Sequence, residues 1–165
     1  MTNHPFGPLY NEKSKVLILG SFPSVKSREE NFFYGHPQNR FWKVLSKVLG
    51  HKTPQTIDEK REFLLENGIA LWDVIASCEI MGSSDSSIKD VTANDISVIL
   101  DAADIKKIYV NGKTAEKYYN KYIKNKTGRE AVCLPSTSPA NAAWNVERLA
   151  LLWGDIAETL KEDGK

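Results

Sequence analysis

Four short apolar runs that alternate with helical patterns constrain the fold of this chain more than any other feature. They lie at residues 16–20, 69–75, 108–110 and 131–134. A short, wholly apolar run is typical of a strand that is buried on both faces. Strands that alternate with helices form a mostly parallel sheet, which right-handed crossovers cover with helices on both sides. The sequence therefore predicts an α/β fold around a four-stranded sheet.

Five helices are expected around this sheet. The first two, at 41–49 and 57–67, each end just before a glycine. The other three are predicted at 92–103, 114–123 and 140–160. Ser138 suits the N-cap of the last helix, and Pro139 suits its first position. No repeat, low-complexity tract or linker interrupts the sequence, so a single domain spanning 1–165 is predicted.

The composition favours a protein without membrane spans or metal-binding cysteines. The two cysteines, Cys78 and Cys133, lie in apolar stretches without metal-ligand spacing, which suits buried, reduced thiols. The first residues lack the basic and then apolar pattern of a leader, and no segment approaches the roughly 20 apolar residues of a membrane helix. We therefore expect a cytoplasmic protein that makes no membrane contact.

Basic residues are unevenly distributed, although the formal net charge is only +1. Residues 106–129 contain eight lysines and arginines against one acid, Glu116. This segregation permits a surface that faces a polyanion such as nucleic acid. A solvated lysine face is the commoner explanation of such a run, so charge alone does not establish nucleic-acid binding.

Chemistry is expected beyond the carboxyl ends of the strands, where open parallel sheets bind their ligands. The segments that follow the four strands are 20–40, 73–88, 111–113 and 135–141. In the first of them, Gly20 permits a sharp turn and Pro23 stiffens it, so backbone amides there could bind a carbonyl or phosphate. No dinucleotide-binding or P-loop motif is present. A plain strand exit is the alternative interpretation.

The segment 32-FFYGHPQNRFW-42 combines aromatic rings with amide side chains. Tyr34 is expected on a loop, where its ring can stack on a flat base. A proline opens the next helix, so Gln38 and Asn39 should lie in its first turn, where amides can discriminate donors from acceptors. Arg40 is expected either to bind a phosphate or to pair with an acid of the same domain. An ordinary helix start, with Asn39 as a capping amide, is the alternative.

The last strand leads into 134-LPSTSPANAAWN-145. The start of the expected fifth helix would offer free amides and a positive dipole end to a phosphate. Ser136, Thr137 and Ser138 add hydroxyl donors, and the small, rigid loop has a shape that can enter a nucleic-acid groove. An ordinary capped helix start is the alternative.

Taken together, these segments resemble the uracil-DNA glycosylase superfamily, and most closely its hypoxanthine-DNA (deoxyinosine) glycosylase branch. The matching segments are 16-VLILGSFPS-24, 33-FYGHPQNRFWKVL-45, 71-LWDVIASCE-79 with 82-GSSDSSI-88, and 134-LPSTSPAN-141. They occur in order and cover most of the chain. The second is also similar to the mismatch-specific uracil glycosylases.

The resemblance implies a three-layer α/β/α domain around a four-stranded parallel sheet. It also implies a monofunctional base-excision enzyme that is monomeric and needs no metal or cofactor. The substrate would be DNA containing a deaminated base, with hypoxanthine first. The enzyme would flip the damaged nucleotide out of the duplex and hydrolyse its N-glycosidic bond by water attack.

Individual residues acquire expected roles from the same resemblance. Asn39 matches the catalytic amide, whose carbonyl oxygen could hold and orient a water, and Tyr34 matches the ring that stacks on the flipped base. The rest of the expected base pocket is Gly20, Ser21, Phe22, Pro23, Ser24, His36 and Gln38. The expected DNA contacts are Arg40, Lys113, Ser136, Thr137, Ser138, Pro139, Ala140 and Asn141. Asp73 and Asp85, on the exit segment of the second strand, are further candidates for catalysis as charge stabiliser or weak base, although each is equally explained as a cap or turn residue. Ser136 is also a candidate for catalysis.

Two positions depart from the uracil-removing relatives. Those proteins carry an Asp or Asn two residues after the motif glycine, where this chain has Phe22. Many place a histidine where this chain has Leu134. Both departures argue against uracil excision by the usual route and shift the expected catalytic role to Asn39.

Three alternative functions remain open from the sequence. One is a mismatch-specific uracil or thymine glycosylase, and another is a non-catalytic module that binds nucleic acid. The third is a small-molecule α/β enzyme with Ser21 or Ser24 as nucleophile. It is disfavoured because the chain has no Gly-x-Ser-x-Gly and no histidine after the last strand.

Overall fold

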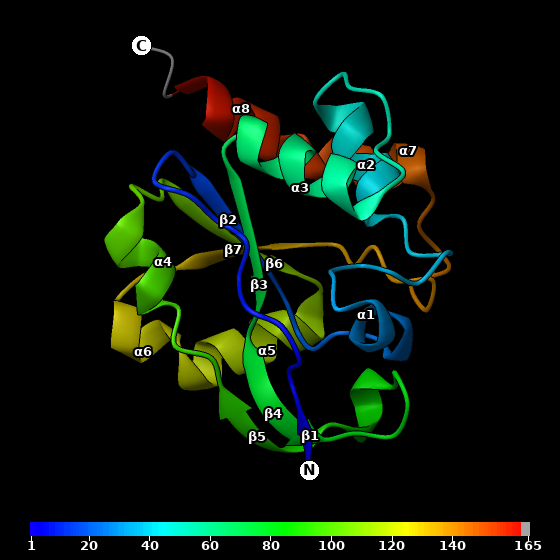
Figure 1. The fold of residues 1–165 in the computed structure, drawn as a ribbon, viewed down its shortest axis with the longest axis vertical. Helices are drawn as coiled ribbons and strands as arrows, with labels where there is room; N and C mark the ends of the chain where they lie inside the picture. Colours follow the sequence, from blue (N-terminus) through cyan, green and yellow to red (C-terminus); the bar gives the residue numbers. More distant parts are fainter. Residues whose placement is uncertain (163–165) are drawn as a thin grey trace.

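The main sheet of the computed structural model, which describes residues 1–162, has four parallel strands in the order β3-β2-β6-β7 (Figure 1). The strands are β2 (Val16–Gly20), β3 (Ile69–Asp73), β6 (Lys107–Asn111) and β7 (Ala131–Leu134). All five residues of β2 are buried, as expected of a strand covered on both faces. The predicted four-stranded parallel sheet is confirmed.

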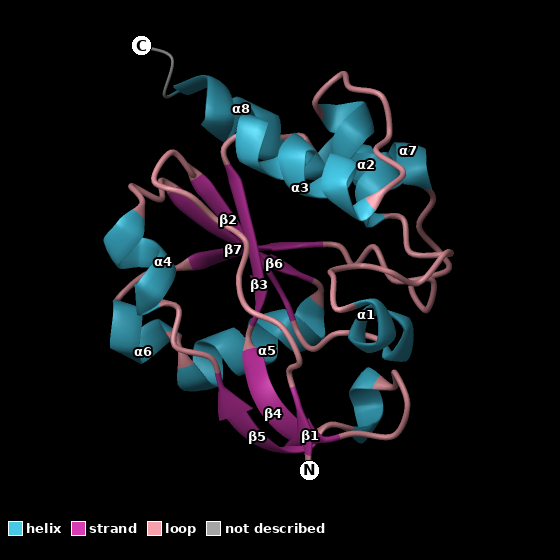
Figure 2. Ribbon diagram, viewed as in Figure 1, coloured by secondary structure: helices cyan, strands magenta, loops and turns pink. Residues whose placement is uncertain are grey.

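Helices cover both faces of this sheet and complete the three predicted layers (Figure 2). The helices on one face are α2 (Phe41–Val48), α3 (Ile57–Glu66), α7 (Val146–Trp153) and α8 (Asp155–Glu162). Those on the other are α4 (Ser97–Ala102), α5 (Lys113–Tyr122) and α6 (Lys124–Thr127). Successive residues of β2 serve the two cores in turn, since Ile18 packs in the first and Leu17 and Leu19 in the second.

A second, antiparallel sheet continues the edge of the first and was not predicted. Its strands, in the order β1-β4-β5, are β1 (Thr2–Asn3), β4 (Ile75–Glu79) and β5 (Lys89–Ala93). Only Val74 separates β3 from β4, so the strand predicted at 69–75 is the start of a longer path that leaves the main sheet. The helix predicted at 92–103 is wrong in its first part, because Thr92 pairs with Ser77 in this sheet and helix begins only at Ser97.

The helix predicted at 140–160 is also wrong. It is two helices, α7 and α8, and α7 begins at Val146 with Asn145 as its N-cap, whose side chain accepts from the Arg148 amide. Residues 138–144 instead form turns whose carbonyls point at Arg40, as described below. The expected phosphate site at a helix start beside Ser138 and Pro139 is therefore absent from the described structure.

Helix α2 begins at Phe41, as its apolar spacing predicted, but the expected place of Gln38 and Asn39 in its first turn is wrong. Residues 36–39 form a turn, closed by a hydrogen bond from the Asn39 amide to the His36 carbonyl at 3.0 Å. The Asn39 side chain accepts from the Phe41 amide, so the helix starts after Arg40, and Gln38 and Asn39 precede its first turn. A further short helix, α1 (Val25–Glu30), follows the first strand exit. Residues 163–165 of the predicted single domain lie outside the described residues. None of the helices within 1–162 has the length and apolar character to cross a membrane.

Candidate active site

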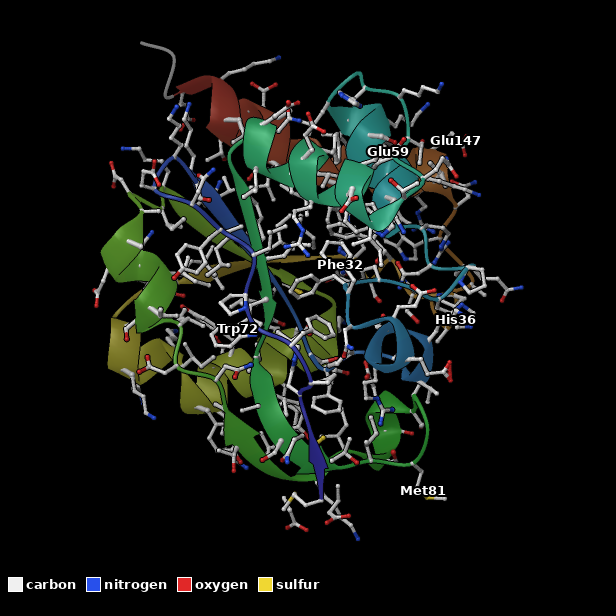
Figure 3. The ribbon with its side chains drawn as sticks, in the orientation of Figure 1. Phe32, His36, Glu59, Trp72, Met81 and Glu147 are labelled. Atoms are coloured by element: carbon white, nitrogen blue, oxygen red, sulfur yellow. The ribbon has the colours of Figure 1, made fainter. Side chains whose placement is uncertain are left out.

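A pocket of about 480 Å³ opens at the carboxyl edge of the main sheet, where the strand-exit segments meet. Its volume lies within the roughly 300–1,000 Å³ typical of small-ligand sites. The predicted residues that line it are Gly20, Ser21, Phe22, Pro23, Ser24, Tyr34, His36, Asn39, Asp73, Asp85, Ser136, Thr137, Ser138, Pro139 and Ala140. Figure 3 shows His36 and Met81 on the same side of the molecule, on two segments that flank this pocket. A larger, open hollow at the amino edge of the sheet contains none of these residues.

Four predicted site residues lie outside the pocket lining. Gln38 is exposed on the turn before α2, and Lys113 is exposed at the start of α5. Asn141 donates from Nδ2 to the Ser136 carbonyl at 3.0 Å, which braces the last loop from within. The fourth is Arg40, whose side chain turns toward the same loop.

Gly20 allows the side chains of Asp73 and Tyr34 to approach the end of the first strand. A Cβ atom built on Gly20 would lie 2.4 Å from Asp73 Oδ1 and 3.0 Å from the Tyr34 hydroxyl. Both distances are shorter than ordinary van der Waals contact, so only glycine fits here without displacing a neighbour. The parallel register that pairs Gly20 with Asp73 creates this contact.

Tyr34 is held in a conformation that most residues avoid. Its φ of 52° lies in the left-handed region, which costs about 1–3 kcal/mol for such a residue and is concentrated at functional sites. The ring stacks on Phe41 with centroids 4.0 Å apart, and the Trp42 indole donates to the Tyr34 carbonyl at 3.2 Å. Burial, together with the negative charge of Asp73, raises the pKa of the Tyr34 hydroxyl, so the ring remains neutral.

Asn111, at the exit of β6, links the pocket floor to the last loop and was not predicted. Its amide group donates to Thr137 Oγ1 at 3.0 Å and accepts from the Thr137 backbone amide at 3.1 Å. It also donates to the Tyr34 hydroxyl at 3.3 Å. Segment 111–113 was expected at the carboxyl edge of the sheet because it follows a strand, but only Lys113 within it was predicted to belong to the site.

Asn39 lines the pocket, and the two ends of its amide group differ in their hydrogen bonding. Oδ1 accepts a hydrogen bond from the Phe41 backbone amide at 2.9 Å, and this contact identifies the oxygen, since a backbone N–H cannot bond to the amide nitrogen. No hydrogen bond from residues 1–162 involves Nδ2. The geometry therefore leaves a donor, rather than a free carbonyl oxygen, as the more available group.

Two carboxyl groups lie in the pocket, one from the last residue of β3 and one from the segment between β4 and β5. Asp73 is only 4% exposed, whereas Asp85 is an exposed residue that accepts from the Ser21 hydroxyl at 3.3 Å. The protein packed around the Asp85 carboxyl raises its pKa, the Ser21 bond opposes that shift, and the negative charge of Asp73 adds to it. These two carboxyl groups make the pocket suited to ligand groups that donate hydrogen bonds or carry positive charge.

His4 reaches Asp73 from the N-terminal strand and was also missed. Its Nε2 lies 2.7 Å from Asp73 Oδ2, and the two side chains are only 3% and 6% exposed. The residues are 69 positions apart, and nothing in the local sequence around His4 indicates such a contact. Only the pairing of β1 with β4 brings them together.

Arg40 organises the last loop through its carbonyl groups. The guanidinium donates to the carbonyls of Ser138 at 2.7 Å and Asn141 at 3.1 Å, and also to those of Thr137 and Trp144. The Ser138 and Asn141 carbonyls also accept from the Asn141 and Trp144 amides, so the loop forms two consecutive turns around Arg40, and helix begins only after Asn145. The expected acidic partner is replaced by main-chain oxygens.

Replacing Arg40 with methionine should loosen this loop. We expect the free energy of unfolding to fall by about 2–4 kcal/mol, because several half-buried carbonyls lose a charged donor. Hydrogen exchange at the amides of residues 136–145 should accelerate, and the thermal midpoint should fall.

Arg40→Lys is the matched control, because it keeps the charge but cannot reach several carbonyls at once. A structural role predicts that the lysine variant is destabilised nearly as much as the methionine variant. Full stability in both variants, with only the salt dependence of DNA binding altered, would identify Arg40 as a phosphate contact instead.

Comparisons of the sequence and the structure with known proteins identify several that this chain resembles. The family described as the Uracil DNA glycosylase superfamily matches residues 8–157. A hypoxanthine DNA glycosylase from Methanosarcina barkeri is 36% identical over 86% of this chain and 89% of its own length. A protein of the same name from Methanosarcina acetivorans is 33% identical over 90% of this chain and 94% of its own. An NMR structure of a candidate uracil DNA glycosylase from Methanosarcina acetivorans gives a TM-score of 0.76 at 30% identity, covering 92% of this chain and 96% of that one.

Proposed function

Since the chain belongs to the uracil DNA glycosylase superfamily, we propose that it hydrolyses the N-glycosidic bond of a deaminated base in DNA, with hypoxanthine as the principal substrate. Uracil is the second candidate base, because the solved relative is described as a uracil DNA glycosylase. We further propose that the protein works as a cytoplasmic monomer, as one domain, without a metal or cofactor. The observation that carries the proposal is a base-sized pocket in which a ring, an amide and two carboxyl groups converge.

The charges of the reaction suit this pocket. Cleavage of the glycosidic bond develops positive charge on the sugar and negative charge on the departing base. Carboxylates near the sugar stabilise the first, and donors aimed at the base stabilise the second. Asp85 is available for the first role, and Asn39 for the second.

Asn39 contributes its amide donor in this proposal. Because Phe41 holds Oδ1, Nδ2 can donate to the departing base and stabilise its negative charge. Tyr34 supports the same base through its ring face. Phe41 stacks on one face of the ring, and the Trp42 indole holds the Tyr34 backbone carbonyl, so the ring needs little rearrangement when a base enters.

Asp85 is the candidate for accepting a proton from the attacking water. Its raised pKa makes the ionised carboxylate a better base than an ordinary surface aspartate, and the Ser21 hydroxyl orients it. Ser136 can add a hydroxyl donor from the opposite wall of the pocket. DNA would lie across the mouth of the pocket, against the loop at 136–141 and against Lys113 at the start of α5.

The decisive experiment uses duplex oligonucleotides that each contain a single inosine, uracil, xanthine or ethenoadenine. The protein is incubated with each, and abasic sites are then cleaved with alkali. Strand breaks at inosine that exceed those at the other bases would support the proposal. A preference for uracil would assign the second candidate, and DNA binding without strand breaks at any base would indicate a non-catalytic module.

A further inference from the structure

The floor of the pocket holds a buried carboxyl group, of which the described residues use only one oxygen. Asp73 Oδ2 accepts from His4, whereas Oδ1 lies beside Gly20 and the Tyr34 hydroxyl. No hydrogen bond from residues 1–162 reaches Oδ1, although the residue is only 4% exposed. Oδ1 is not one of the fully buried atoms that lack a partner, and Asp73 lines the pocket, so this oxygen is available to a donor that a ligand brings.

His4 is built to hold the other oxygen in place. Its Nδ1 accepts from the Phe6 backbone amide at 3.4 Å, so the ring proton lies on Nε2, toward Asp73. The imidazole packs edge-on against Phe6 and Phe22, with centroids 4.5 and 5.9 Å away. The His4 backbone amide donates to the Ala76 carbonyl at 2.7 Å, which anchors the residue to the small sheet.

These contacts give Phe22 a role. Its ring forms an apolar wall for the imidazole. An apolar wall excludes water from the His4–Asp73 contact and strengthens it.

We propose that His4 is a positioning residue that fixes the Asp73 carboxylate, so that Oδ1 accepts the ring N–H of a deaminated base. This inference rests on the proposed function and refines its substrate class. Hypoxanthine and uracil each present a ring N–H beside a carbonyl, whereas adenine and cytosine present a lone pair at the same ring nitrogen. A carboxylate oxygen attracts the first arrangement and repels the second, so the pair selects the chemical change that deamination produces.

The test compares His4→Phe, which keeps an aromatic ring but removes the donor, with His4→Gln. The glutamine amide nitrogen is separated from Cβ by as many bonds as His Nε2, so it can restore the hydrogen bond. Single-turnover release of hypoxanthine should slow by about 10- to 100-fold in His4→Phe and recover most of its rate in His4→Gln. The affinity for inosine-containing DNA should change much less than the rate, because the phosphate contacts are untouched.

Two further variants separate positioning from general stability. Phe6→Leu alters the packing beside His4 without removing its donor, so it should retain nearly the wild-type rate. Combining His4→Phe with Asp73→Asn should be no slower than Asp73→Asn alone, since His4 acts through Asp73. A structural role for His4 would instead make the two losses multiply.

The outcomes distinguish this inference from the function on which it rests. If the wild-type protein releases hypoxanthine or uracil and His4→Phe is equally fast, the positioning role is overturned and the function stands. Multiplying losses in the double variant, or a His4→Gln rate as low as that of His4→Phe, would also overturn it. Failure of the wild-type protein on every deaminated base would overturn both proposals.

Discussion

Asn39→Ala should reduce single-turnover release of hypoxanthine from inosine-containing DNA by about 100- to 1,000-fold, while leaving DNA binding intact. The reason is the loss of the amide donor that faces the departing base in the proposed mechanism. Alanine also removes the acceptor for the Phe41 amide, which should lower the free energy of unfolding by only about 0.5–2 kcal/mol. The measurement is a rapid-quench time course with enzyme in excess, alongside a binding assay.

Asn39→Asp is the sharper variant, because it keeps the oxygen that caps α2 and replaces only the donor. If Nδ2 stabilises the departing base, the aspartate variant should be as slow as the alanine variant, since a negative charge now faces a developing anion. If instead the carbonyl oxygen holds the attacking water, aspartate should retain much of the rate. A wild-type rate in both variants would remove Asn39 from the mechanism altogether.

Gly20→Ala should impair the same step by about 10- to 100-fold through a purely steric change. The new methyl group would lie 2.4 Å from Asp73 Oδ1, and that oxygen cannot withdraw freely because His4 holds the carboxylate from behind. Either the His4 contact breaks or the carboxylate moves into the space for the base. The free energy of unfolding should fall by about 1–3 kcal/mol, as is usual for overpacking.

Gly7→Ala provides the matched control, because a Cβ there would meet no atom within 4 Å. It should leave both stability and the rate of base release near wild type. Equal rates in Gly20→Ala and wild type would show that Asp73 can shift without consequence. That result would argue against any catalytic or recognition role for the carboxylate position.

The main sheet could be predicted because its strands are buried on both faces and therefore read as continuous apolar runs. The small sheet gave no such signal, since β5 is mostly exposed and β4 is buried only in part. The helix at 140–160 was predicted from its caps and its apolar residues. It failed because Arg40, about a hundred positions earlier, binds the carbonyls of Ser138 and Asn141 and holds this segment as two turns.

The parts of the site that depend on local sequence were predicted, and the parts that depend on contacts between distant residues were not. The loops at the carboxyl edge were predictable from the parallel sheet, and most of the expected pocket residues meet there. His4 and Asn111 were not predicted, because their roles depend on partners brought together only by the fold. The orientation of the Asn39 amide was likewise invisible until the Phe41 contact identified its oxygen.

The contacts between Arg40 and the last loop affect how much conformational entropy the protein would lose each time it binds DNA. A flexible loop would lose conformational entropy each time it settled on DNA, which weakens binding and slows each encounter. Here the carbonyls of Ser138 and Asn141 are already fixed to one guanidinium, so that ordering is complete when the chain folds. In the proposed complex with DNA, the protein would therefore meet each site along a duplex with a preformed loop, and the entropic penalty of recognition would fall mainly on the nucleotide that must leave the helix.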